Sequence, residues 1–432
     1  MRRSWGFGDL LPNLFERMGA TKTHDDTRSL PELSEALLSA EGEVSGYKLA
    51  ATVLVRYQSA SDVERLAFFD YLNTHLDLDA EHLAALAHEY AKTPSPEVYQ
   101  SLTQAAEPRR QELLRRLNQP VGATQSLVAM RTDLSRFIKT NPELARTDQD
   151  FVHLLRSWFN RGFLMLEQIN WSTPAAILDK IVAYEAVHQI DDFEALRRRL
   201  APPDRRCFAF FHPSMPAEPL IFVEVALTSG IPGSVADLLR EDRNPIAADA
   251  ATTATFYSIS NCQKGLAGIS FGNLLIKQVV SELSLELPNL KTFVTLSPIP
   301  GLSAWLSKKT DDEALQMANE DAQAGNASDE TLRSLAARYL LTAKTSDGRL
   351  RDPVARFHLG NGAEVYQIHV GADPSENGMS QSYGTMVNYL YDLSRTEQNH
   401  EAFASRGLVA ASREVEALLS AEIQPTRKGK VA

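Results

Sequence analysis

Residues 207–227 read CFAFFHPSMPAEPLIFVEVAL, and this stretch decides how the second half of the chain folds. It consists of two apolar runs, rich in aromatic and β-branched residues, on either side of a segment that contains three prolines. Such runs are typical of strands, and the prolines and polar residues between them are typical of a turn. The stretch therefore predicts two neighbouring strands, 207–211 and 220–227, joined by a loop.

The rest of this half continues the same alternation. Three further apolar runs predict strands at 253–259, 291–296 and 364–370. Helical spacing of apolar residues predicts one helix that ends near residue 286 and others over 311–345 and 381–393, with an exposed polar loop at 319–329. Strands interleaved with helices predict a mixed α/β domain over residues 161–432.

The first part of the chain has a different character. Residues 83–90 place leucine, alanine and tyrosine at the spacing that lines one face of a helix. The pairs Ser95-Pro96 and Asn141-Pro142 each put a capping side chain before a proline, which is a helix start signal. Residues 1–160 are therefore expected to form an all-α helical bundle, and the whole chain an α+β protein.

The composition narrows the class of protein. The 432 residues carry a net charge of −11, which argues against nucleic acid or an anionic membrane as the main partner. Cys207 and Cys262 are too few for a disulfide scaffold or a cysteine-based metal site. No apolar run approaches membrane-spanning length, and Asp9 and Pro12 interrupt any apolar signal core. We expect no membrane contact and a cytoplasmic location.

A glycine-bearing segment, QKGLAGISFG at residues 263–272, joins the strand at 253–259 to a helix. Its glycines let backbone amides approach a ligand closely, and a helix N-terminus after them favours a phosphate or pyrophosphate. The spacing matches neither the Walker loop nor the dinucleotide-binding fingerprint. The segment is therefore either an anion-binding loop or a flexible turn between strand and helix.

The same segment contains GISFG at 268–272, which has the G-x-S-x-G form of a hydrolase nucleophile elbow. An elbow serine stands directly at the end of a strand, whereas Ser270 follows the expected strand end at Ile259 by about ten residues. This motif supports a serine hydrolase or thioesterase as an alternative hypothesis.

Three further polar residues are candidates for chemistry. Ser297 ends an apolar strand and precedes Pro-Ile-Pro-Gly, so its hydroxyl is expected at a rigid strand edge, as a catalytic group or as the cap of a tight turn. His358, on an expected turn before the strand at 364–370, is a candidate proton donor or acceptor and equally an ordinary loop histidine. His212 has the same two interpretations. The histidines show no H-E-x-x-H motif, so we expect no metal site.

Four long strings occur together: HPSMPAEPLIFVEVALTSGIP, FYSISNCQKGLAGISFGNLLIKQVV, TFVTLSPIPG and ARFHLGNGAEVYQIHVGADPSENGMSQSYGTMVNYLYDL. In sequence and in order they resemble the malonyl-CoA decarboxylase family, and they cover most of residues 205–393. The upstream string SWFNRGFLMLEQINW resembles the family as well. The resemblance implies an N-terminal helical oligomerisation domain and a C-terminal catalytic domain with a GNAT-like fold. It also implies conversion of malonyl-CoA to acetyl-CoA and carbon dioxide, without biotin or metal.

The resemblance assigns site residues by motif. The serine of SPIPG is Ser297, the histidine of FHLxNGA is His358 and the tyrosine of NYxY is Tyr391, and these are the expected catalytic residues. The loop expected to contact the CoA pyrophosphate comprises Ala267, Gly268, Ile269, Ser270, Phe271, Gly272 and Asn273. Some family members carry a glutamate where Ser270 stands, so a catalytic role of that glutamate does not transfer to this chain.

The chemistry of the reaction sets what these residues must do. Loss of carbon dioxide from a malonyl thioester leaves an enolate, which requires donors at the thioester oxygen and an acid near the α-carbon. Ser297 and His358 are expected to act as a pair that holds the carboxylate and delivers the proton. We expect a homo-oligomer, a dimer or tetramer, formed through the helical domain. A hydrolase, a GNAT acyltransferase and a non-catalytic acyl-CoA-binding module are the alternatives.

Overall fold

The computed structural model describes residues 26–269, 272–308 and 313–420, and the chain divides into two compact units. The first unit contains the described residues up to Leu164 together with 212–218 and 263–269. The second contains Met165–Phe211, Pro219–Cys262 and the described residues from 272 onward.

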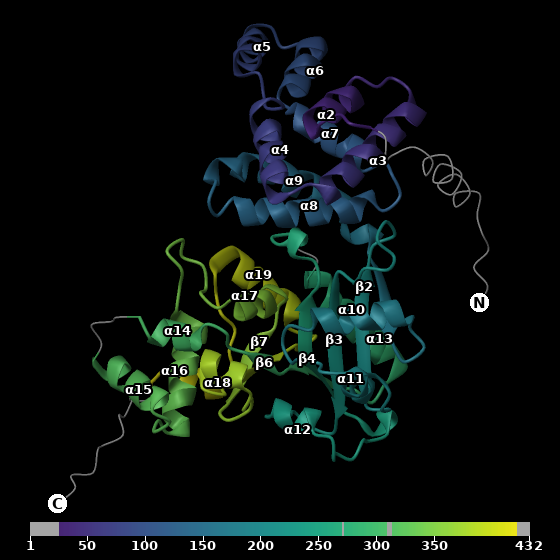
Figure 1. Ribbon diagram of the computed structural model, residues 1–432. Coiled ribbons are helices and arrows are strands. Elements are labelled where there is room, and N and C mark those ends of the chain that lie inside the picture. Colours follow the sequence, from purple (N-terminus) through teal and green to yellow (C-terminus); the bar gives the residue numbers. More distant parts are fainter. Residues whose placement is uncertain (1–25, 270–271, 309–312, 421–432) are drawn as a thin grey trace, which may run out of the picture. The chain divides into compact units, whose positions relative to one another are not determined.

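The first unit is built from helices (Figure 1). They are α2 (Leu30–Leu38), α3 (Glu43–Ser59), α4 (Asp62–Thr74), α5 (Ala80–Lys92), α6 (Pro96–Ala105), α7 (Arg109–Leu117), α8 (Ala123–Phe137) and α9 (Ala145–Trp158), with the short 3-10 turns η1 (Pro142–Leu144), η2 (Arg161–Phe163) and η4 (Lys264–Leu266). Ser61 opens α4 with a capping box, because its hydroxyl accepts from the Glu64 amide while the Glu64 carboxylate accepts from the Ser61 amide.

Of the helix starts predicted at Ser95-Pro96 and Asn141-Pro142, the first is confirmed and the second marks only a short 3-10 turn. Ser95 caps α6 and Pro96 is its first residue, as the sequence predicts. Asn141-Pro142 opens only η1, and the Asn141 side chain makes no capping hydrogen bond there. The long helix α9 begins three residues later, so this second signal marks a boundary but does not supply a cap.

The second unit contains an eight-stranded mixed sheet. Its strands are β1 (Met165–Ile169), β2 (Arg205–Phe211), β3 (Ile221–Thr228), β4 (Thr253–Asn261), β5 (Thr292–Thr295), β6 (Ser297–Pro298), β7 (Glu364–His369) and β8 (Met386–Leu390). They follow the order β1-β2-β3-β4-β5-β8-β6, and β7 also pairs with β8. The strands predicted from residues 207–227 are β2 and β3, which pair antiparallel.

The sheet divides between β4 and β5. These two strands are parallel, and their pairing ends where Phe256 lies opposite Thr295. β4 continues to Asn261, whereas the chain after β5 turns into β6 and pairs with β8. The two strands therefore separate directly before Ser297.

Helices surround this sheet (Figure 1). They are α10 (Ala175–Tyr184), α11 (Phe193–Leu200), α12 (Val235–Leu239), α13 (Gly272–Glu286), α14 (Leu302–Leu306), α15 (Glu313–Gln323), α16 (Asp329–Thr342), α17 (Pro353–Gly360), α18 (Glu376–Ser382), α19 (Thr396–Arg406) and α20 (Arg413–Ala417), with the 3-10 turn η3 (Ala248–Ala250). Ile181 of α10 and Leu196 of α11 are buried in one cluster with Ala209 and Phe222 of the sheet. Burial of this apolar area stabilises the unit.

Three expectations need correction. His358 lies in the last turn of a helix, α17, and not on a turn, because Asp352 caps that helix and Pro353 is its first residue. The segment 381–393 is not a helix but holds strand β8 at its centre, because α18 is stopped by Tyr383 and Gly384, both with positive φ. The expected loop at 319–329 is helical through Gln323.

The predicted fold class, a helical part followed by a mixed sheet with helices on it, is confirmed. Strand β1 was missed, since its residues are mostly exposed and carry no apolar run. No helix in the described part of the chain is both long and apolar enough to span a membrane.

Candidate active site

Ser297 is held at the point where the sheet divides. It is the first residue of β6, pairs with Val387 of β8, and is 5% exposed. The Ser297 hydroxyl donates to Oγ1 of Thr295 at 2.8 Å. This Thr295 oxygen also accepts a hydrogen bond from the Tyr389 amide at 3.2 Å. A backbone amide of the neighbouring strand thus fixes Thr295, and Thr295 orients Ser297.

His358 reaches Ser297 from helix α17. Its Nε2 lies 3.2 Å from the Ser297 hydroxyl, and its Nδ1 lies 2.8 Å from the hydroxyl of Tyr391. The ring stacks on Tyr389, with centroids 4.5 Å apart and an interplanar angle of 23°. The imidazole is thereby held on both nitrogens and on one face, which is the rigid placement that catalysis requires.

Burial controls the charge of this group of residues. His358 is 2% exposed, and burial lowers its pKa from 6.5 to about 3. Burial also raises the pKa of the Tyr391 phenol well above its usual value. At neutral pH the imidazole is therefore uncharged and the phenol keeps its proton.

The hydrogen bonds of Tyr391, His358 and Ser297 all donate in the same direction, from the phenol toward the serine. Since Ser297 donates to Thr295, its oxygen is free to accept the proton on Nε2 of His358. Nδ1 of that tautomer accepts from the Tyr391 hydroxyl. The trio Ser297, His358 and Tyr391 can thus present and relay a proton without carrying a charge.

The predicted CoA loop is only partly described. Ala267, Gly268 and Ile269 belong to the first unit, where Gly268 has a φ of +78° that favours glycine. Ser270 and Phe271 lie outside the described residues, so the hydrolase elbow does as well. Gly272 and Asn273 begin helix α13 in the second unit.

A buried arginine that sequence reasoning missed holds the start of this loop. Arg131 of α8 donates from Nη1 to the carbonyls of Gly265 and Ala267, at 2.7 and 2.9 Å, and from Nε to Asp148 at 2.7 Å. A side chain at Gly265 would come within 1.9 Å of the Val128 carbonyl, so glycine is required there for packing. No sequence motif marks Arg131, because the two carbonyls that it holds lie more than a hundred positions away.

The other candidate histidines have structural partners. His212 is buried, with Nε2 3.1 Å from the Trp158 carbonyl and Nδ1 accepting from the Ser214 amide. His369 contacts the Asn388 side chain, and Asn388 in turn donates to the Thr295 carbonyl. Neither joins the trio. Within the described ranges, no group of three His, Cys, Asp or Glu residues is arranged to hold a metal ion.

The comparisons with known proteins cover both parts of the chain. Residues 162–429 match the malonyl-CoA decarboxylase C-terminal domain model, and residues 76–159 match the N-terminal domain model. The chain is 34% identical to the mitochondrial malonyl-CoA decarboxylases of Anser anser anser and Mus musculus, over 72% and 74% of its length and 70% and 73% of theirs.

Solved structures agree. A malonyl-CoA decarboxylase from Rhodopseudomonas palustris superposes with a TM-score of 0.85 at 51% identity, covering 90% of this chain and 98% of that one. One from Agrobacterium vitis gives 0.84 at 51% identity, with 90% and 99% coverage.

Proposed function

Because this chain belongs to the malonyl-CoA decarboxylase family, we propose that it removes carbon dioxide from malonyl-CoA and releases acetyl-CoA. The observation that carries the proposal is the buried, uncharged hydrogen-bond chain through Tyr391, His358 and Ser297. Ser297 and His358 contact the malonyl group, and Tyr391 holds the tautomer of His358. The loop from Ala267 to Asn273 contacts the pyrophosphate of CoA.

The reaction breaks the bond between the carboxylate and the α-carbon. The electron pair moves into the thioester as an enolate, carbon dioxide leaves, and the α-carbon takes up one proton. The thioester enters where β4 and β5 separate, and hydrogen-bond donors at this split stabilise the negative charge that develops on its oxygen. This separation of a parallel pair also supports the GNAT-like arrangement. Ser297 orients the carboxylate, and the pair with His358 supplies the proton.

The same geometry argues against a serine hydrolase that uses Ser297. A hydrolase histidine must accept the serine proton and become an imidazolium, which a carboxylate then stabilises. Here the third residue is a phenol, and burial alone holds the pKa of His358 at about 3. An uncharged donor suits enolate chemistry better than it suits nucleophile activation.

No biotin or metal is needed in this proposal, because the thioester itself accepts the electrons. The test uses purified protein with malonyl-CoA as the sole substrate, in the presence of EDTA and avidin. We expect carbon dioxide and acetyl-CoA in equal amounts. Malonate and free CoA as products would instead identify a hydrolase, and activity restored by added metal would refute the metal-free mechanism.

We further propose that residues 1–160 form the oligomerisation domain and 161–432 the catalytic domain. Helices α5 and α6 support this, since they pair with each other and contain no buried residue. Tyr99 is 56% exposed on this hairpin and contacts the ring of Tyr90. Exposed aromatic surface of this kind is a common site of association with a second copy of the chain.

Light scattering tests the assembly. The wild-type chain should form a dimer or tetramer, and Tyr99→Glu should shift it to a smaller species. Gln100→Glu adds the same charge one residue away and serves as the control. A wild-type chain that is only monomeric at micromolar concentration would rule the oligomer out.

The proposed compartment is the cytoplasm. Its reducing conditions suit a chain that has only two cysteines, Cys207 and Cys262, both of them buried. The animal relatives are named mitochondrial, so fractionation of the native cell decides between the two compartments.

A further inference from the structure

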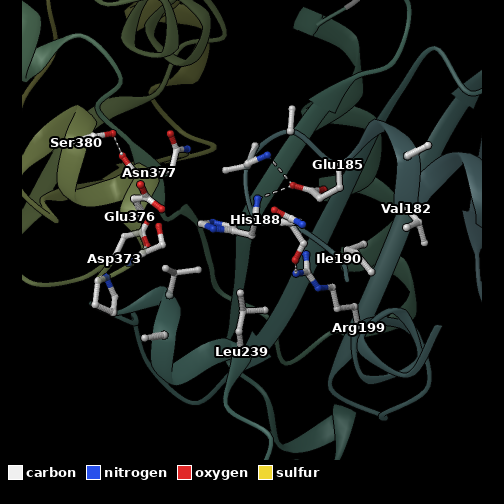
Figure 2. Close-up of a pocket in the computed structure, with 18 residues that line it drawn as sticks. Val182, Glu185, His188, Ile190, Arg199, Leu239, Asp373, Glu376, Asn377 and Ser380 are labelled. Carbon is white, nitrogen blue, oxygen red and sulfur yellow. Dashed lines mark hydrogen bonds between the residues drawn. The ribbon is translucent and has the colours of Figure 1, made fainter. Parts of the chain in front are cut away.

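A cavity of about 1090 Å³ lies in the second unit, between the segment after α10, helix α12 and the start of α18 (Figure 2). Ser297 and His358 are not among its lining residues. Val182, Ile190, Val235 and Leu239 form its apolar wall. The volume is suited to a small organic molecule.

The charge around this cavity is mainly negative. Glu185, Asp373 and Glu376 line it, and Asp373 is only 6% exposed. Arg199 is the one cation among the described lining residues. Arg199 already forms an ion pair with Glu224, which does not line the cavity, because its Nη1 donates to this fully buried carboxylate at 3.0 Å. An anionic ligand would therefore meet an excess of negative charge.

A buried histidine gives a second, independent indication of a ligand. His188 lines the cavity and is 8% exposed, and its Nε2 has no hydrogen-bond partner among the described residues. Figure 2 shows its ring extending toward Asp373 and Glu376. Burial lowers the pKa of this imidazole, so the ring is neutral and one nitrogen offers a lone pair. A buried polar atom without a partner is unusual in a folded protein.

We propose that this cavity binds a small organic cation, a protonated primary amine on a short apolar chain. An ammonium group has three N–H donors, which match a carboxylate oxygen of Asp373, the Nε2 of His188 and a water between them. Glu376 adds negative charge at the rim, and the carbon chain lies against Val235 and Leu239. A divalent metal fits less well, since no three metal-ligating side chains come together in the described residues.

This site is separate from the proposed decarboxylation, and its test measures binding and not activity. Isothermal titration of the full chain near neutral pH uses n-butylammonium and putrescine as probes and n-butanol as the neutral analogue. We expect saturable one-site binding of at least one amine at millimolar concentration or below, and none of the alcohol.

Variants locate the site. Asp373→Asn should weaken amine binding by about tenfold or more, because a charge-assisted hydrogen bond is lost. Asp373 also accepts from the Ser375 amide, so Glu376→Gln at the exposed rim is the second variant, with an expected loss of about threefold. Glu401→Gln, an exposed carboxylate on α19, should leave binding unchanged. No saturable amine binding, equal binding of butanol, or unchanged affinity in a folded Asp373→Asn and in Glu376→Gln would each overturn the proposal.

Discussion

The Oγ atom of Ser297 lies 3.2 Å from Nε2 of His358, although the two residues are 61 positions apart in the chain. β6 holds the serine through its pairing with β8, and α17 carries the histidine in its last turn. Both side chains are almost fully buried, so their hydrogen bond forms out of contact with bulk water. A bond in such surroundings is strong and well oriented.

Removing either residue should lower kcat more than it changes KM. Loss of one aimed donor typically costs about 10²–10³ in rate, roughly 2.7–4 kcal/mol, and we expect Ser297→Ala and His358→Asn to lose that much or more. The double variant should lose much less than the sum, because the two act as one proton-transfer unit. Steady-state kinetics on all three variants, with circular dichroism as the folding control, measures this.

Ser270→Ala is the matched comparison for that series. If the trio performs the chemistry, this variant keeps most of its turnover. An inactive Ser270→Ala beside an active Ser297→Ala would overturn the decarboxylase mechanism and favour the hydrolase elbow.

Thr295 should act as a positioning residue for Ser297. Thr295→Val keeps the shape but removes the oxygen that accepts from Ser297 and from the Tyr389 amide. We expect kcat to fall about tenfold with KM little changed, and the free energy of unfolding to fall by about 1–3 kcal/mol because the amide loses its partner.

Thr295→Ser restores the oxygen and should restore kcat. Equal kcat in the valine and serine variants would mean that Thr295 only packs the core. Urea unfolding of each variant separates the loss of stability from the loss of turnover.

Burial of His358 makes stability depend on pH in a defined window. Its pKa is about 3 in the folded chain, against 6.5 when unfolded, so between these values the unfolded state binds the extra proton. The folded state therefore has its full stability with respect to this group above pH 6.5, and loses stability progressively as the pH falls toward 3. The free energy of unfolding should therefore drop by up to about 1.4 kcal/mol per pH unit from this one group.

Urea unfolding of the wild type and of His358→Asn between pH 7 and 5 isolates that contribution, since other titrating groups are common to both. The variant should lose stability less steeply. Parallel curves for the two proteins would show that His358 titrates normally, and would remove the uncharged trio from the mechanism.

Gly268→Val should raise KM for malonyl-CoA. The φ of Gly268 is +78°, and although a β-carbon there meets no atom within 4 Å, a β-branched residue strains this backbone. The strain costs about 1–2 kcal/mol and moves the amides that would contact pyrophosphate.

Gly348→Val is the matched control, since Gly348 has a φ of +79°, an open surrounding and an exposed position in another loop. Both variants should lose similar stability, and only Gly268→Val should show the higher KM. If the two have the same KM, CoA is bound elsewhere.

The apolar strands were determined by the sequence itself. Most residues of β2, β3 and β4 are buried, and apolar runs such as CFAFF and IFVEVAL mark these segments as strands whichever strand lies beside them. The prolines after Ser297 predict an interruption of the strand at that point, whereas the pairing of β6 with the distant strand β8 is what holds the serine in place. Tyr391 entered the expected site only through the family motif.

Other features were decided only by the tertiary structure. The segment that forms β8 contains apolar residues compatible with a helix, and it becomes a strand because β5, β6 and β7 all pair with it. Thr295 and Arg131 each bind backbone groups of distant elements, which no local pattern specifies. The charge of His358 is set by burial, because removal of water is a property of the packed unit and not of any short stretch of chain.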